Sequence, residues 1–69
     1  MEHKEHILHK FEELLLETYL YEDLNALTYV QEHHMEYCLI RFNNGYTKKV
    51  NITADGDLAL IKDVLKALY

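Results

Sequence analysis

The chain has 69 residues, 49% of them hydrophobic and 12% aromatic, and its twelve acids against seven lysines and arginines give a formal net charge of -5. This length predicts a single domain, 1–69, and this apolar content excludes an intrinsically disordered protein. The negative charge opposes binding to a nucleic-acid backbone, and no apolar run approaches the roughly 20 residues of a membrane-spanning helix.

The excess of acids is confined to the first 25 residues, which hold seven acids and two lysines, whereas the rest of the chain is neutral. Cys38 is the only cysteine, so no intramolecular disulfide can form. The amino-terminal residues do not resemble a signal peptide. We therefore expect a cytoplasmic protein without a membrane span.

Residues 2–20 have the periodicity of an amphipathic helix. Apolar side chains recur at the helical repeat in a stripe about 100° wide, with acids and histidines opposite. The stripe consists of Ile7, Leu8, Phe11, Leu14, Leu15 and Thr18. The next residues, 19–26, allow either an extension of this helix through Tyr21 or a turn at 22–25, and we favour the turn.

Three segments, 27–32, 36–42 and 46–52, alternate between apolar and polar residues and are rich in strand-forming types, so they predict three strands. His33-His34 falls at the first turn. Asn43-Asn44-Gly45 falls at the second, where glycine supplies the positive φ that a tight hairpin needs.

The second turn has two alternative registers. A three-residue loop pairs Cys38 with Val50 and gathers most apolar side chains on one face, namely Cys38, Ile40, Phe42, Tyr46, Val50 and Ile52. A two-residue loop shifts the pairing by one residue and places Tyr37 and Leu39 with Val50 and Ile52. We prefer the three-residue loop because it separates the two faces better.

After capping residues in 53–57, the apolar side chains of Leu58, Ile61, Val64, Leu65 and Leu68 form the stripe of a second helix. Lys62 and Lys66 lie toward its carboxyl end, where the helix dipole favours cations. The predicted fold is α+β with the order α-β-β-β-α, an antiparallel three-stranded meander with both helices packed on one face.

Five histidines suggest a metal site. His3, His6 and His9 recur on the first helix, and His33 and His34 lie at the first turn; zinc accepts imidazole and carboxylate ligands from such pairs as Glu2 and His6. One alternative is therefore a small zinc-binding, dimeric structural module. The other is that these histidines are solvated and that His9 contacts Glu5 and Glu13 at i, i+4 spacing.

No catalytic motif is present, and we expect a protein that is not an enzyme. Cys38 lies in mid-strand on the predicted core face, where a cysteine is usually a small buried hydrophobe rather than a nucleophile. Arg41, Lys48 and Lys49 lie near tyrosines on the second hairpin, which suggests a nucleic-acid-binding hairpin. The net charge opposes that alternative.

Two features predict a protein-binding surface. One is the group of acids in the amino-terminal third, and the other is an apolar stripe on the sheet face that the helices leave uncovered. Their candidate residues are Glu12, Glu13, Glu17, Glu22, Asp23, Val30, Tyr37 and Leu39. Carboxylates favour a basic partner surface, and tyrosine with branched aliphatics is typical of interfaces, either with a partner or within a homodimer.

A short acidic chain that combines the meander sequence CLIRFNNGYTKKVNI with the helix ADGDLALIKDVLKALY resembles small phage and prophage proteins of Gram-positive bacteria. In size, charge and element order it is similar to anti-CRISPR proteins that inhibit type II-A Cas9. The resemblance is architectural, extends loosely over 2–69, and rests on no diagnostic motif. It implies a non-enzymatic inhibitor in the host cytoplasm that occupies a basic, DNA-binding surface of Cas9, with acidic side chains as the contacts.

Overall fold

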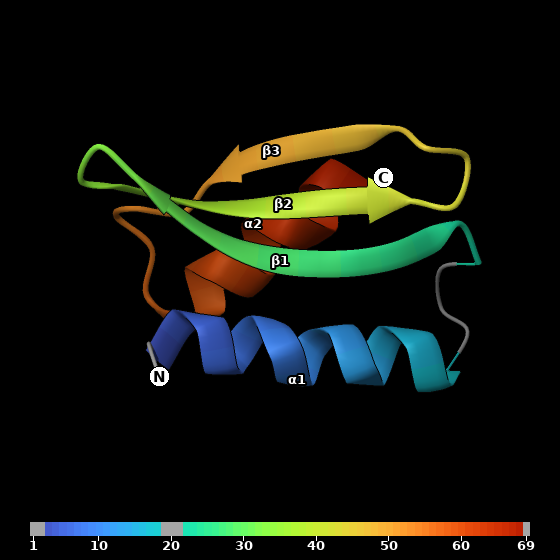
Figure 1. Cartoon of the computed structure of the whole chain (residues 1–69). Coiled ribbons are helices and arrows are strands. Elements are labelled where there is room, and N and C mark those ends of the chain that lie inside the picture. Colours follow the sequence, from blue (N-terminus) through green and yellow to red (C-terminus); the bar gives the residue numbers. More distant parts are fainter. Residues whose placement is uncertain (1–2, 19–21, 69) are drawn as a thin grey trace.

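The computed structural model describes residues 3–18 and 22–68. Its elements in chain order are α1 (His3–Thr18), β1 (Leu24–Glu32), β2 (Met35–Phe42), β3 (Thr47–Asn51) and α2 (Asp57–Leu68). The strands form one antiparallel sheet in the order β1-β2-β3, and α1 runs alongside β1 while α2 lies behind the sheet (Figure 1). The predicted α-β-β-β-α meander is confirmed.

β1 begins earlier in the chain than the predicted strand. Residues 22–23 form a turn, and Leu24 already begins β1, with a bulge at Asn25. The strand is therefore longer than the predicted segment 27–32. Tyr21, Glu2 and the end of the predicted helix at 19–20 lie outside the described residues.

The three-residue hairpin register is confirmed. Cys38 pairs with Val50, and the Phe42 N–H donates to the Tyr46 carbonyl at 2.8 Å. Gly45 has φ +93°, and its N–H donates to the Phe42 carbonyl at 3.0 Å. Glycine adopts this conformation at no steric cost, which explains why the chain reverses here.

The first turn contains no glycine, yet it also needs the left-handed region. Glu32 pairs with Met35, and between them His33 has φ 49° and His34 has φ 66°. Positive φ at both central residues is the type I′ geometry that matches strand twist in a two-residue hairpin. Histidine is among the non-glycine residues that tolerate it.

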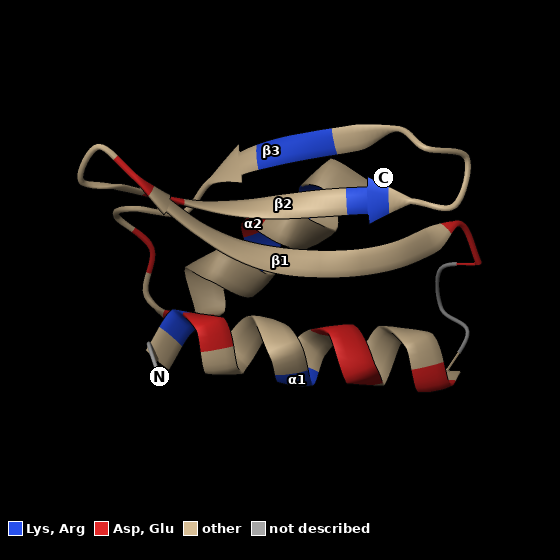
Figure 2. Ribbon diagram, in the orientation of Figure 1, with Lys and Arg blue, Asp and Glu red and all other residues tan. Residues whose placement is uncertain are grey.

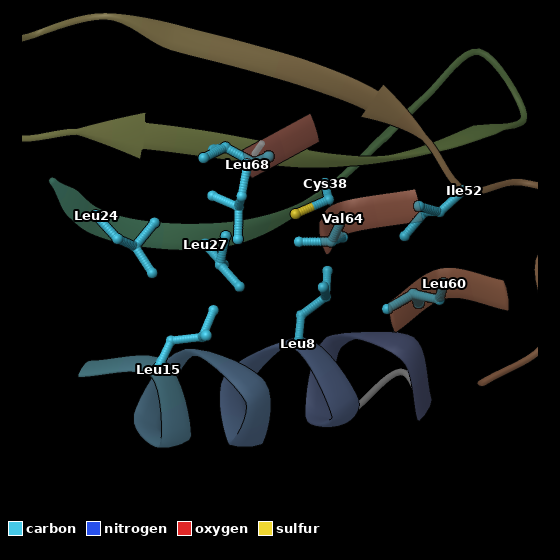
Figure 3. Packing of buried hydrophobic residues seen from close by; sticks show 10 residues of the cluster. Leu8, Leu15, Leu24, Leu27, Cys38, Ile52, Leu60, Val64 and Leu68 are labelled. Atoms are coloured by element: carbon cyan, nitrogen blue, oxygen red, sulfur yellow. The ribbon is translucent and has the colours of Figure 1, made fainter. Parts of the chain in front are cut away.

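The core lies between the helices and one face of the sheet, called the inner face below. Figure 3 shows its side chains converging from both helices and the strands. Its buried residues are Leu8, Leu15, Leu24, Leu27, Cys38, Ile40, Ile52, Leu60, Val64 and Leu68.

Both helices are rotated relative to the predicted stripes. In α1, Leu14 is 52% exposed and Thr18 is exposed, whereas Glu12 is half-buried because its carboxylate bonds to β1. In α2 the buried row is Leu60, Val64 and Leu68, spaced by four residues, which leaves Leu58 68% exposed. The predicted membership of Leu14, Thr18 and Leu58 in the buried stripes was wrong.

The start of α2 also differs from the prediction. The Gly56 carbonyl accepts the Leu60 N–H at 2.9 Å, so glycine occupies the N-cap position in place of a capping side chain. Asp57 is the first residue of α2, where the helix dipole favours its charge.

Candidate protein-binding surface

The face of the sheet opposite the helices is called the outer face. Strand alternation and the pairing register assign its residues, which are Ala26, Thr28, Val30 and Glu32 of β1, Met35, Tyr37, Leu39 and Arg41 of β2, and Thr47, Lys49 and Asn51 of β3. The predicted stripe of Val30, Tyr37 and Leu39 lies at its centre, and all three side chains are half-buried. No helix described by the structure covers this face.

An ion pair crosses the outer face from one edge strand to the other. The Lys49 ammonium of β3 bonds to the Glu32 carboxylate of β1, and on the way it lies 4.3 Å from the centroid of the Tyr37 ring. The hydrogen bond with Lys49 lowers the pKa of Glu32, and that with Glu32 raises the pKa of Lys49. The outer face thus combines an apolar centre with charges of both signs.

The three basic residues of the second hairpin do not share one face. Arg41 and Lys49 belong to the outer face, but Lys48 belongs to the inner face, where its ammonium donates to the Ala67 carbonyl at 2.7 Å at the end of α2. Lys48 is therefore occupied within the molecule. A continuous basic groove, which single-strand binding needs, does not form from these three residues.

The predicted acids lie mostly at the end of the molecule where α1 finishes and β1 begins (Figure 2). Glu13, Glu17, Glu22 and Asp23 are exposed and are together called the acidic surface. Glu13 pairs with His9 at 3.1 Å and lies 3.9 Å from the Lys10 ammonium. In the described part of the chain, no cation lies within ion-pair distance of the other three.

The turn formed by Glu22 and Asp23 is held in place by Asn43 of the second hairpin. The Asn43 side-chain amide donates to the Glu22 carbonyl at 3.0 Å, and the Asn43 backbone N–H donates to the Asp23 carbonyl at 2.8 Å. These bonds engage backbone oxygens only. Both carboxylates of the turn are thus positioned while staying accessible.

Glu12 has a different environment from the other predicted acids. Its carboxylate accepts the Leu27 N–H at 2.7 Å, and its side chain is 20% exposed. The structure gives Glu12 an intramolecular role, so it is left out of the acidic surface.

Both helices have an acid in the first turn, but their last turns differ in charge. In α2, Asp57 is in the first turn and Lys66 in the last, as the helix dipole favours. In α1, Glu17 is the penultimate residue, and the last turn contains no basic residue. A carboxylate at this end costs stability, by about 0.5 kcal/mol per residue for an exposed group.

The predicted metal ligands are dispersed over the molecule. His3 bonds to both Asp57 oxygens at 3.0 Å, His9 to Glu13, His6 is exposed on α1, and His33 and His34 lie at the tip of the first hairpin. Within 3–18 and 22–68, no group of three or more histidine, cysteine, aspartate or glutamate residues could hold a metal ion. The structure brings two-residue pairs together, such as His3 with Asp57.

Cys38 is fully buried on the inner face. Burial raises the pKa of its thiol to about 12, and the negative charge of Glu12 adds to this effect. Cys38 is therefore a protonated core residue near neutral pH, as its mid-strand position predicted.

A polar cluster that the sequence did not reveal joins α1 to the sheet. Lys4 donates to Glu36 Oε1 and the Ile52 carbonyl, each at 2.8 Å, and to the Thr53 carbonyl at 3.0 Å. Tyr29 donates to Glu36 Oε2 at 2.7 Å. The bonds from Lys4 and Tyr29 lower the pKa of Glu36.

Comparison of the chain with protein families, with curated proteins and with solved structures found no match. Among the described residues, no helix combines the length and the apolar character that crossing a bilayer requires.

Proposed function

We propose that this protein is a non-enzymatic interaction protein whose acidic surface binds a basic surface of a partner protein. The observation that carries the proposal is the placement of Glu17, Glu22 and Asp23, which are exposed and lack a cation within ion-pair distance among the described residues. A partner's lysines or arginines would supply the missing positive charge.

The cost of these charges to the fold supports this interpretation. Glu17 lies at the end of α1 where the helix dipole disfavours an acid, and no neighbouring basic residue in that turn compensates it. Charged residues that destabilise the fold are typical of binding sites, where a residue needed for binding is kept although its position disfavours it.

The resemblance to anti-CRISPR proteins gives the partner class. A surface that handles nucleic acid carries many lysines and arginines, and an acidic protein that occupies it excludes the phosphate backbone. We therefore propose the DNA-binding surface of a type II-A Cas9 as the first partner to test. Electrostatic attraction would accelerate encounter, and apolar contacts would slow release.

The test is a binding titration of purified Cas9 with the protein and with the double variant Glu17→Gln/Asp23→Asn. Each substitution keeps the size of the side chain and removes one charge. We expect the variant to bind at least about tenfold more weakly and its affinity to depend less on salt. We also expect its melting temperature to be equal or higher, because Glu17 opposes the dipole of α1.

The matched control is Ala54→Lys/Ala59→Lys, which changes the net charge by the same amount at two exposed positions outside the acidic surface. If this control weakens binding as much as the double variant, net charge rather than the acidic surface governs binding. If Cas9 does not bind the parent protein, the Cas9 assignment is wrong. The acidic surface can then be tested by the same variants with any basic partner captured by the parent chain.

A further inference from the structure

The outer face has the composition of an interface but no covering element among the described residues. Val30, Tyr37 and Leu39 are half-buried at its centre, and Met35 is 43% exposed beside them. Arg41 is exposed at its rim, and no carboxylate in the described part of the chain lies within ion-pair distance of it. Aromatic residues, methionine and arginine are the types enriched in protein interfaces.

The order of these residues along the strands is self-complementary. In the register of β1 and β2, Glu32 lies opposite Met35 at one end of the outer face, and Arg41 lies opposite Ala26 at the other end. Tyr37 and Leu39 lie between them. Lys49 engages Oε1 of Glu32, which leaves the second oxygen to accept another hydrogen bond.

We propose that the outer face is the interface of a symmetric homodimer in which Arg41 of each copy pairs with the partner subunit's Glu32. The two-fold axis lies in the plane between the two sheets, at right angles to the strands, and passes between Tyr37 and Leu39. It places Tyr37 over the partner subunit's Leu39. The same rotation sets the arginine end of one sheet against the glutamate end of the other. An isologous contact requires such self-complementarity.

The size of the outer face sets the strength of this dimer. Three strands spaced about 4.8 Å apart, with the longest rising about 3.3 Å per residue over nine residues, give each copy roughly 400 Å² of contact surface. Two such surfaces together are smaller than a standard specific interface and match a weak, transient contact, so we expect a dissociation constant of about 10 to 100 µM.

The dimer leaves uncovered the part of the acidic surface that lies on α1, namely Glu13 and Glu17. α1 packs against the inner face, so its exposed carboxylates stay free when two outer faces meet. The dimer would carry two acidic surfaces, yet the inference does not depend on the proposed function, since it concerns other residues and another measurement.

The experiment is sedimentation equilibrium at physiological salt, from about 10 µM to about 1 mM protein, a range that spans the expected dissociation constant. We expect the parent chain to dimerise with increasing concentration. Arg41→Glu and Glu32→Arg each place like charges across both contacts, so each alone should weaken dimerisation at least about tenfold. Circular dichroism and a melting curve establish that both variants fold.

The decisive sample is an equal mixture of Arg41→Glu and Glu32→Arg. In a mixed dimer every contact again joins opposite charges, so we expect the mixture to regain dimerisation to within about threefold of the parent chain. The matched controls are Lys62→Glu and Glu5→Arg, exposed reversals of the same size away from the outer face, which should leave the dimer unchanged.

A parent chain that is monomeric at the highest concentration would overturn the proposal and leave the outer face to a different partner. The same holds if the two variants dimerise as the controls do, because the interface then lies elsewhere. Variants that weaken the dimer without recovering in the mixture would show that Arg41 and Glu32 do not pair across it.

Discussion

Lys4 illustrates how one side chain can fasten a helix to a sheet. Its ammonium donates all three of its hydrogens, two of them to backbone carbonyls at the start of the loop that follows β3, and its side chain is only 16% exposed. Partly buried carbonyls that lose their donor are costly to leave unpaired. Lys4 therefore belongs to the structural framework, although it is a lysine in a surface helix.

We predict that Lys4→Met, which keeps the length of the side chain, lowers the melting temperature by about 5 to 15 °C. The control is Lys10→Met on the same helix. Lys10 is 63% exposed, and its ammonium makes only a long contact, 3.9 Å, with the Glu13 carboxylate. Thermal denaturation followed by circular dichroism measures both. Equal effects of the two substitutions would contradict the role assigned to Lys4.

Asp55 and Asp63 form a second unusual pair. One Asp55 oxygen is buried without a hydrogen-bond partner. Desolvation raises the pKa of Asp55 above its ordinary value of 3.8, and the hydrogen bond with Asp63 and the charge of Asp63 raise it further, against an opposing effect of Lys4. The folded protein thus holds a proton on Asp55 more tightly than the unfolded chain does.

A raised carboxyl pKa contributes stability that is complete below the ordinary value and is lost as the pH rises through the raised pKa. Above the raised pKa, the desolvated Asp55 carboxylate, with Asp63 beside it, opposes folding. We predict that Asp55→Asn raises the melting temperature by about 2 to 4 °C near pH 7 and by less than about 1 °C near pH 3.

The difference in melting temperature between variant and parent, compared at the two pH values, reports on Asp55 and its contact with Asp63. Glu22→Gln, at an exposed position with no cation within ion-pair distance among the described residues, is the control. A stabilisation by Asp55→Asn that is the same at both pH values would contradict repulsion between the two carboxylates.

At the scale of elements, α1 does more than cover the core. It runs alongside β1, an edge strand of the sheet, and its Glu12 carboxylate accepts the outward-pointing N–H of Leu27 (Figure 1). A charged acceptor on a partly buried backbone donor is among the stronger hydrogen bonds in proteins. This bond also sets the rotation of α1, because it draws Glu12 toward the sheet and turns Leu14 outward.

We predict that Glu12→Ala lowers the free energy of unfolding by about 1 to 2 kcal/mol, because the Leu27 N–H loses its acceptor. Glu13→Ala, one position along and 48% exposed, should change it by less than about 0.5 kcal/mol. Urea denaturation measures both. A larger effect of Glu13→Ala than of Glu12→Ala would show that the bond to Leu27 does not stabilise the protein.

At the scale of the whole molecule, the zinc-dependent alternative concerns the stability of the entire fold. His3 and His9 already bond to carboxylates, on different parts of the molecule, and His33 and His34 belong to a separate turn. We predict equal melting temperatures in excess chelator and in added zinc, together with no zinc in the purified protein. A shift of several degrees between the two conditions would instead favour the metal-dependent module.

The topology and the hairpin register were predictable because they follow from local chemistry. The Asn-Asn-Gly run needs positive φ at one position, and the alternation of apolar residues around it selects one register. The exposure of Glu17, Glu22 and Asp23 was also predictable, because charged side chains are seldom buried without a partner. The uncovered outer face follows from two helices that pack on the same side.

What the sequence could not give depends on contacts between distant segments. Periodicity defines an apolar stripe but not its rotation, which in α1 depends on Glu12 reaching β1. Nothing near Lys4 in the sequence indicates that it binds carbonyls 48 and 49 residues away. Asp55 likewise has the sequence position of a helix cap, and only the packing of its loop on α2 brings it to Asp63.

The position of α1 along β1 also bears on how molecules of this chain can aggregate. Fibrils that grow strand by strand need an accessible edge on both sides of each sheet. Within the described residues, α1 obstructs the β1 side, whereas β3 lies at the other edge with two lysines among its five residues. An added strand therefore meets less obstruction beside β3 than beside the part of β1 that α1 flanks, which disfavours edge-to-edge growth into a filament.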